Sequence, residues 1–268
     1  MTFEARGVAL FSGEHALVRL SRCEGPTTLH TSQGGGALET WSPIDAFRTT
    51  ALAHSSGARV ACVEHLFAAL AAYGAHEGVA IFVQGAELPI LDGASLEWCM
   101  LLDELGVASS APSLAIARDA KIEVGESTYS FAPGSHASVA VTIDLTRAGS
   151  FAASLPTGSY WNGTRVDFAE KIASARTFVL ERDLASFAKK SEAHAPPESF
   201  VVIDETGAKT AGRAFDPQEP ARHKLLDLLG DLFAFGGPPL GHIEATRPGH
   251  AQSREAVRLA LAQGILTH

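Results

Sequence analysis

Residues 222–233 read Arg-His-Lys-Leu-Leu-Asp-Leu-Leu-Gly-Asp-Leu-Phe, and their leucines recur at the spacing of an α-helix. His223, Asp227 and Asp231 lie four residues apart, so their side chains project from one face of that helix. The helix is otherwise apolar nearly all round, which indicates that it is buried. Buried imidazole and carboxylate groups are costly unless other groups satisfy them, so this polar face needs a partner.

Two interpretations of the polar face remain open at this point. In the first, the imidazole and the carboxylates cap neighbouring backbone groups or pair with arginines. In the second, His223 and Asp227 are ligands of a metal ion, because positions i and i+4 of one helix point two donors at the same ion. The metal interpretation requires a third ligand and an acid or base elsewhere in the chain.

Composition and charge limit the class of protein and its possible partners. The chain has 268 residues, of which 46% are hydrophobic and 19% are charged, as expected of a soluble globular protein with one large or two medium domains. A formal net charge of −9 argues against nucleic acid as a partner, since phosphate binding needs a concentrated basic surface. The N-terminus lacks the pattern of a signal peptide, and no apolar run approaches membrane-spanning length. We therefore expect a cytoplasmic protein without a transmembrane segment.

The N-terminal part of the chain alternates strand-like and helical patterns. Ala- and Leu-rich residues 63–73 predict a helix that ends at Gly74. The other expected elements are strands at 7–14 and 15–20, a glycine-rich loop at 34–36, strands at 58–62 and 79–83, and a helix over 95–106.

The same order of elements restarts after residues 108–112, a short linker of small and polar residues. Besides the helix around His223, the patterns predict strands at 120–131, 139–145 and 241–245 and helices near 166–173 and 253–263. We predict an α+β fold with two similarly built domains, residues 1–107 and 113–268, in which helices pack on β-sheet layers.

Glu64 and His65 form the second informative stretch, near the start of a helix that is expected to be buried. In a purely structural role, Glu64 would interact with the helix dipole and His65 would pack at a domain edge. Adjacent helical positions point about 100° apart, so His65 could instead bind an ion while Glu64 reaches a water molecule on it. The stretch by itself does not decide between these roles.

A third stretch, residues 241–250, runs from a strand through a Pro-Gly turn to His250, just ahead of the final helix. Loop residues on a rigid scaffold often carry chemistry, although a lone histidine in a loop is more often simply solvated. The positive N-terminus of the helix disfavours a protonated His250. A nearby carboxylate such as Asp231 could reverse that effect, as a general acid requires.

Together these stretches resemble the zinc-dependent UDP-3-O-acyl-N-acetylglucosamine deacetylases of lipid A biosynthesis. The resemblance rests on Val63-Glu64-His65-Leu66, Ala175-Arg176-Thr177-Phe178, Arg222-His223-Lys224-x-x-Asp227-x-x-Gly230-Asp231-Leu232 and Gly249-His250. Weaker similarity at residues 7–13 and 88–93 extends the match over most of the chain. Four separated motifs in the same order are far more specific than any one of them.

The resemblance implies that His65, His223 and Asp227 bind zinc, with an open fourth position as in catalytic zinc sites. Ferrous iron is an alternative, because imidazole and carboxylate ligands suit several divalent ions. The resemblance also implies a hydrolase whose active site lies between the two domains and whose partner is an acylated UDP-sugar. We expect the enzyme to be a monomer.

The resemblance assigns catalytic roles to further residues. Glu64 would be the general base, and His250, oriented by Asp231, would be the cationic group that protonates the leaving amine. The other implied roles are a hydrogen bond from Thr177 to the oxyanion, and contacts of Lys224 and Phe178 with the sugar nucleotide.

Two departures from the family pattern affect specificity. Phe11 stands where the family usually has a histidine, and residues 179–197 differ from the family's glycine-rich loop in a region that lines its acyl-chain passage. The enzyme could therefore accept a different acyl length or another N-acetylated sugar. A second alternative is a non-catalytic relative that binds a nucleotide sugar, although such a protein would not need Glu64 and His250 around an open metal site.

Overall fold

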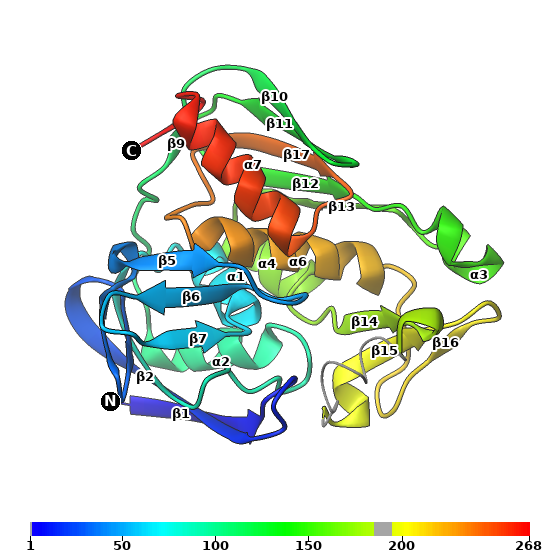
Figure 1. The fold of residues 1–268 in the computed structure, drawn as a ribbon, viewed down its shortest axis with the longest axis horizontal. Helices are drawn as coiled ribbons and strands as arrows, with labels where there is room; N and C mark the ends of the chain where they lie inside the picture. Colours follow the sequence, from blue (N-terminus) through cyan, green and yellow to red (C-terminus); the bar gives the residue numbers. More distant parts are fainter. Residues whose placement is uncertain (1, 185–194) are drawn as a thin grey trace.

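The computed structural model describes residues 2–184 and 195–268, and two five-stranded sheets enclose its central helices (Figure 1). The helices are α1 (Glu64–Tyr73), α2 (Leu96–Leu105), α3 (Ser150–Ala153), α4 (Arg165–Lys171), α6 (Glu219–Phe233) and α7 (His250–Ala262). Short 3-10 turns span η1 (Leu38–Thr40), η2 (Thr146–Ala148) and η3 (Pro197–Ser199). None of the described helices is long and apolar enough to cross a membrane.

The first sheet has the strand order β1-β2-β8-β3-β4. Its strands are β1 (Thr2–Val8), β2 (His15–Pro26), β3 (Thr28–Thr31), β4 (Gly34–Ala37) and β8 (Glu77–Gln84). Neighbouring strands are antiparallel except β3 and β8, which run parallel.

The second sheet repeats this arrangement strand for strand, in the order β10-β11-β17-β12-β13. Its strands are β10 (Ala120–Val124), β11 (Ser127–Ala132), β12 (Ala137–Thr142), β13 (Gly158–Trp161) and β17 (Gly241–Thr246). Among the described strands of this sheet, the parallel pair is again formed by the third and fourth strands of the order, β17 and β12, and the other neighbours are antiparallel. The α+β fold is thus confirmed, and the shared topology supports the division into domains at 1–107 and 113–268, which stays our proposal.

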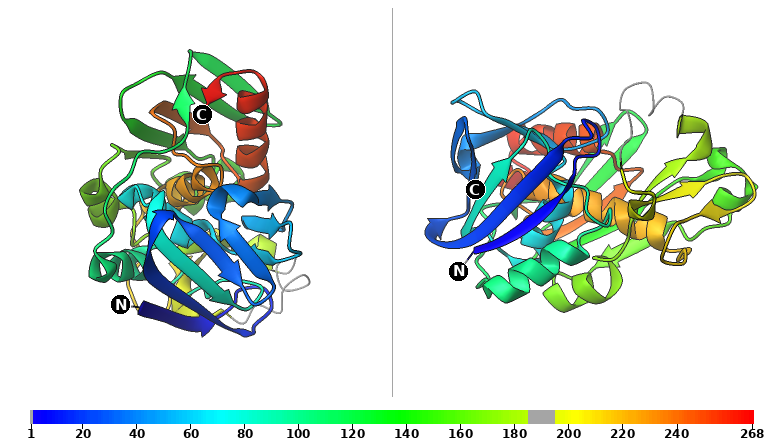
Figure 2. Two further views of the ribbon diagram at one scale, coloured as in Figure 1. Left: turned by 90° about the vertical axis from the view of Figure 1, so that its left-hand side faces the viewer. Right: turned by 90° about the horizontal axis from the view of Figure 1, so that it is seen from below.

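The central helices lie between the two sheets (Figures 1 and 2). α2 packs on α1 and on the first sheet, α7 packs on α6 and β10, and α1 packs against α6. One hydrophobic core includes residues of both sheets and both central helices, among them Ile81, Leu66, Leu229 and Ile243. Because every residue of α1 is buried, the polar side chains at its start are enclosed between the halves.

Three smaller sheets complete the fold. They join β5 (Trp41–Ile44), β6 (Ala51–His54) and β7 (Arg59–Ala61); β14 (Thr177–Leu180), β15 (Phe200–Ile203) and β16 (Ala208–Lys209); and β9 (Ala115–Ile116) with β18 (Leu266–Thr267). The β14 sheet lies at the end of the molecule where α6 begins (Figure 1).

Three local expectations were wrong. The first strand is residues 2–8 rather than 7–14, because the chain already turns after Val8. Residues 34–36 belong to β4 rather than to a loop, since β4 approaches β3 so closely that a Cβ at Gly35 would lie 2.1 Å from the carbonyl oxygen of Leu29. The final helix begins at His250 rather than near Ser253, because Gly249 is the extended residue that precedes its first turn.

Candidate active site

A cavity of about 410 Å³ opens where α1, β14, α6 and the start of α7 meet. Eight of the nine residues singled out in the sequence line it, namely Glu64, His65, Thr177, Phe178, His223, Lys224, Asp227 and His250. The ninth, Asp231, lies buried behind His250 and is hydrogen-bonded to it. The structure therefore brings all nine together from four segments of the chain.

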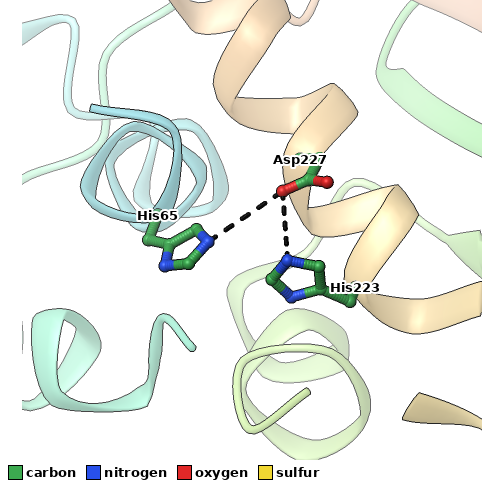
Figure 3. A group of neighbouring side chains, drawn as sticks. All are labelled: His65, His223 and Asp227. Carbon is green, nitrogen blue, oxygen red and sulfur yellow. Dashed lines mark ion pairs between the residues drawn. The ribbon is translucent and has the colours of Figure 1, made fainter. Parts of the chain in front are cut away.

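Two imidazoles and one carboxylate converge at the centre of the site (Figure 3). Helix α1 supplies His65, while α6 supplies His223 and, one turn later, Asp227. The Oδ1 atom of Asp227 lies 3.3 Å from Nε2 of His223 and 4.0 Å from Nε2 of His65. All three side chains are buried, and their donor atoms lie within 4.8 Å of one another. The spacing suits three ligands of a single ion.

The lowered pKa values of His65 and His223 support a cation between these two side chains and Asp227. Burial, followed by neighbouring His223, lowers the pKa of His65 to about 3, and burial also lowers the pKa of His223. His223 lies with Nδ1 3.0 Å from the carbonyl oxygen of Ala175, so a neutral ring carries its proton there. Its Nε2 lone pair then faces a carboxylate oxygen. Two acceptors in that position repel each other unless a cation lies between them, so the group fits a divalent metal.

Lys224 supplies positive charge on the other side of Asp227. Its ammonium group donates a hydrogen bond to Oδ2 of Asp227, which leaves Oδ1 for the histidine side. Burial opposes the charge of Lys224, but the attraction of Asp227 outweighs it and raises the pKa of Lys224 above its ordinary value. The site thus holds a local cation although the whole chain carries a formal net charge of −9.

Glu64 is the first residue of α1 and has the environment of a tuned base. Its Oε1 and Oε2 atoms lie 2.7 and 2.9 Å from the hydroxyl of Thr49, and Oε2 also accepts a hydrogen bond of 3.0 Å from the backbone N–H of Thr50. Burial raises the pKa of Glu64, which makes the carboxylate a better proton acceptor.

His250, which lines the cavity, forms a pair with Asp231. Nδ1 of His250 lies 2.8 Å from Oδ1 of Asp231, and Nε2 lies 3.8 Å from Oδ2 of Asp227. Burial by itself would lower the pKa of His250. The negative charges of Asp231 and then Asp227 outweigh this effect and raise the pKa to about 9. A raised pKa favours the cationic form of His250 at neutral pH, in which Nε2 carries a proton on the side that faces Asp227.

Thr177 and Phe178 line the cavity from β14. The backbone N–H of Thr177 donates to the carbonyl oxygen of Gly93, which fixes the start of this strand. The ring of Phe178 meets His223 edge-on with the centroids 6.5 Å apart. Val179 and Leu180 also line the cavity, so the segment 179–197 that departs from the family pattern begins at the site. Residues 185–194 of that segment lie outside the described residues.

Sequence reasoning missed Thr49 and Thr50, which hold Glu64 and Asp231, because nothing in their local pattern distinguishes them from other threonines. It also missed the carbonyl of Ala175, since a backbone acceptor leaves no sequence signal. Phe11 is not among the cavity residues. Its backbone N–H donates to Glu87, and its neighbour Leu10 reaches the cavity instead.

Convergent metal donors, a buried carboxylate and a cationic imidazole around one cavity are the parts that metal-assisted hydrolysis requires. The fold and the site therefore define a candidate metal-dependent hydrolase.

Comparison with known proteins agrees with this class. Residues 1–262 match the family model described as LpxC: UDP-3-O-acyl N-acetylglycosamine deacetylase. The UDP-3-O-acyl-N-acetylglucosamine deacetylase of Myxococcus xanthus (strain DK1622) is 33% identical over 226 residues, which cover 82% of this chain and 69% of that protein. The protein of the same name from Anaeromyxobacter dehalogenans (strain 2CP-C) is 34% identical over 227 residues, covering 82% and 70%. The chain belongs to this family of deacetylases.

Proposed function

We propose that the protein is a zinc-dependent deacetylase that removes the N-acetyl group of UDP-3-O-acyl-N-acetylglucosamine in lipid A biosynthesis. Membership of the family supports the reaction, and the convergence of His65, His223 and Asp227 beside Glu64 and His250 is the observation that carries it. The two imidazoles and one carboxylate fit zinc, with ferrous iron as the alternative.

Zinc, when bound by His65, His223 and Asp227, would supply a Lewis acid that polarises the acetamide carbonyl and activates water. Glu64 takes the proton of the attacking water, since it is the buried carboxylate with the raised pKa beside the ligands. Thr177 donates a hydrogen bond to the oxyanion that develops on the carbonyl.

The leaving amine requires a proton, and His250 supplies it, since its raised pKa keeps the ring protonated at neutral pH. Its Nε2 side faces the site, while Asp231 accepts the hydrogen bond from Nδ1 and so fixes the ring. The positive charge of His250 also stabilises the tetrahedral oxyanion. Lys224 and Phe178, which line the same cavity, contact the sugar nucleotide in this proposal.

A second candidate substrate is another N-acetylated sugar with a different acyl chain or none. The observation that favours it is the departure of residues 179–197 from the family pattern at positions that line the cavity. A non-catalytic nucleotide-sugar-binding role is less consistent with a buried base and a cationic acid beside three metal donors. Monomeric state and cytoplasmic location remain part of our proposal.

Mass spectrometry of the reaction products tests the proposal directly. Zinc-loaded protein is offered UDP-3-O-acyl-N-acetylglucosamine with several acyl lengths, and release of acetate is followed for wild type and for the matched variants Glu64→Gln and His250→Ala. We expect acetate loss in wild type and a decrease of about 10²- to 10⁴-fold in each variant. Bound zinc without acetate loss at any acyl length would contradict this substrate.

A further inference from the structure

The segment Thr49-Thr50, between β5 and β6, contacts both proton-transfer groups of the site. This inference rests on the proposed function, because it concerns the positions of Glu64 and His250. Thr49 and Thr50 are 3% and 7% exposed, so neither hydroxyl has bulk water as an alternative partner. Each hydroxyl must therefore bond to the protein. The Thr49 hydroxyl bonds to Glu64, and the Thr50 hydroxyl bonds to Asp231 and contacts His250.

Thr49 is oriented toward Glu64 by a third group. The backbone N–H of Cys62 donates to the Thr49 hydroxyl oxygen at 3.1 Å, which uses an acceptor site of that oxygen. The hydroxyl proton of Thr49 is then free to donate only to the carboxylate of Glu64.

The same peptide adds a second donor to Glu64. The Thr49 hydroxyl and the Thr50 N–H supply two protons to a carboxylate that offers roughly four lone-pair sites. Glu64 is therefore held in one orientation while it keeps lone pairs for a water molecule. Fixed donors of this kind preorganise a catalytic side chain that would otherwise rotate.

Thr50 reaches the other side of the cavity. Its hydroxyl donates to Oδ1 of Asp231 and lies 3.2 Å from Nδ1 of His250. Asp231 accepts from both groups at the same oxygen, so the hydroxyl fixes the carboxylate that orients the imidazole. Thr50 comes from the β5–β6 connection, whereas Asp231 lies on α6 and His250 on α7.

We propose that Thr49 and Thr50 are positioning residues that set the base Glu64 and the acid His250 at a constant separation through one peptide unit. Thr49 acts through Glu64, and Thr50 acts through Asp231. Neither hydroxyl is assigned a contact with substrate or metal.

Valine and serine variants test the two hydroxyls separately. Thr49→Val keeps the shape and removes the hydroxyl, and we expect kcat to fall about 10- to 100-fold with KM within about 2-fold. Thr49→Ser restores the hydroxyl and should recover most of kcat. Thr50→Val and Thr50→Ser should behave in the same way. Zinc content, measured by inductively coupled plasma mass spectrometry, should equal that of wild type in all four variants.

Two controls separate positioning from a loss of folding. Thr27 is 1% exposed and bonds through its hydroxyl to the carbonyl oxygen of Ala75, away from the cavity, so Thr27→Val should lower the melting temperature but not kcat. In a Glu64→Ala background, Thr49→Val should lower the residual rate less than about 2-fold, because the group through which it acts is gone.

A full wild-type kcat in Thr49→Val, with the kcat of Glu64→Ala lowered about 10²- to 10⁴-fold, would overturn the inference while leaving the proposed function intact. Equal losses in Thr49→Ser and Thr49→Val would also overturn it, since the hydroxyl would then not be the cause. Full activity of Glu64→Ala would instead remove the base from the proposed mechanism.

Discussion

At the scale of single residues, Arg176 supports the site although it does not line the cavity. It is 1% exposed and binds Glu219 through two parallel hydrogen bonds of 2.9 and 3.0 Å. Arg176 lies between Ala175, whose carbonyl oxygen contacts His223, and Thr177, which lines the cavity. The pair thus holds the backbone that orients His223, a candidate metal ligand.

Arg176→Met should lower the free energy of unfolding by about 3 kcal/mol, because it leaves the Glu219 carboxylate buried without its main partner. Urea denaturation measures the change. The matched control is Lys121→Met, which breaks an exposed ion pair with Glu123 and should cost less than about 1 kcal/mol. Similar losses in both variants would contradict the structural role of Arg176.

His76 gives the stability a dependence on pH. It is half-buried against the ring of Phe233 at 4.9 Å between centroids, and burial lowers its pKa from 6.5 to about 4. The unfolded chain binds a proton between these values and the folded chain does not, so stability is lost as pH falls from about 6.5 to about 4. His76→Gln should reduce this loss by on the order of 2 kcal/mol. Denaturation curves of wild type and His76→Gln at pH 7 and pH 4 measure this loss. An equal loss of unfolding free energy in both proteins would refute the prediction.

At the scale of elements, the crossing of α1 and α6 depends on Gly230. A Cβ at this position would lie 2.2 Å from the carbonyl oxygen of Glu64, at the point where α1 begins. The helices can approach this closely only because residue 230 has no side chain. Their approach places His65 beside His223 and Asp227.

Gly230→Ala should therefore destabilise the protein by about 1–3 kcal/mol, although alanine is the better helix former by about 1 kcal/mol. Zinc affinity should fall as well, since α1 must move with His65. Thermal unfolding and zinc titration measure the two effects. Gly207→Ala is the control, because nothing lies within 4 Å of its added Cβ, and it should change stability by less than about 0.5 kcal/mol. A Gly230→Ala protein as stable as wild type would show that the helices can separate freely.

At the scale of the whole molecule, the candidate metal ligands come from both halves of the chain. His65 belongs to the part that carries the first sheet, and His223 and Asp227 to the part that carries the second. An ion bound to all three should stabilise the packing of the halves, by about 4 kcal/mol when free zinc exceeds its dissociation constant 1,000-fold. Chelation should then lower the melting temperature by roughly 5 to 15 °C.

Calorimetry with and without a chelator measures this shift. In His223→Ala, which lacks one ligand, the melting temperature should no longer respond to the chelator. A wild-type protein that has lost its zinc yet melts at the same temperature would contradict a metal bond between the halves.

The sequence by itself determined the α+β class, the two central helices and the family resemblance. Periodic apolar residues and Gly74 are local signals, and they located α1 correctly because each acts within a few residues of itself. The polar face of α6 was predictable for the same reason. The strand β4 was not predictable, because a run of glycines by itself indicates a loop. The reason for these glycines is the neighbouring strand β3, which leaves no room for a Cβ, and that contact is seen only in the structure.

Only the tertiary structure decided how the candidate site is assembled. Thr50 and Asp231 are 181 residues apart in the chain, and no local pattern predicts their contact. The same holds for the carbonyl oxygen of Ala175 beside His223, for the burial that lowers the pKa of His65 and His223, and for the carboxylates that raise the pKa of His250. Residue types are local properties of the chain, whereas desolvation and the distances between charges arise only when the two halves pack together.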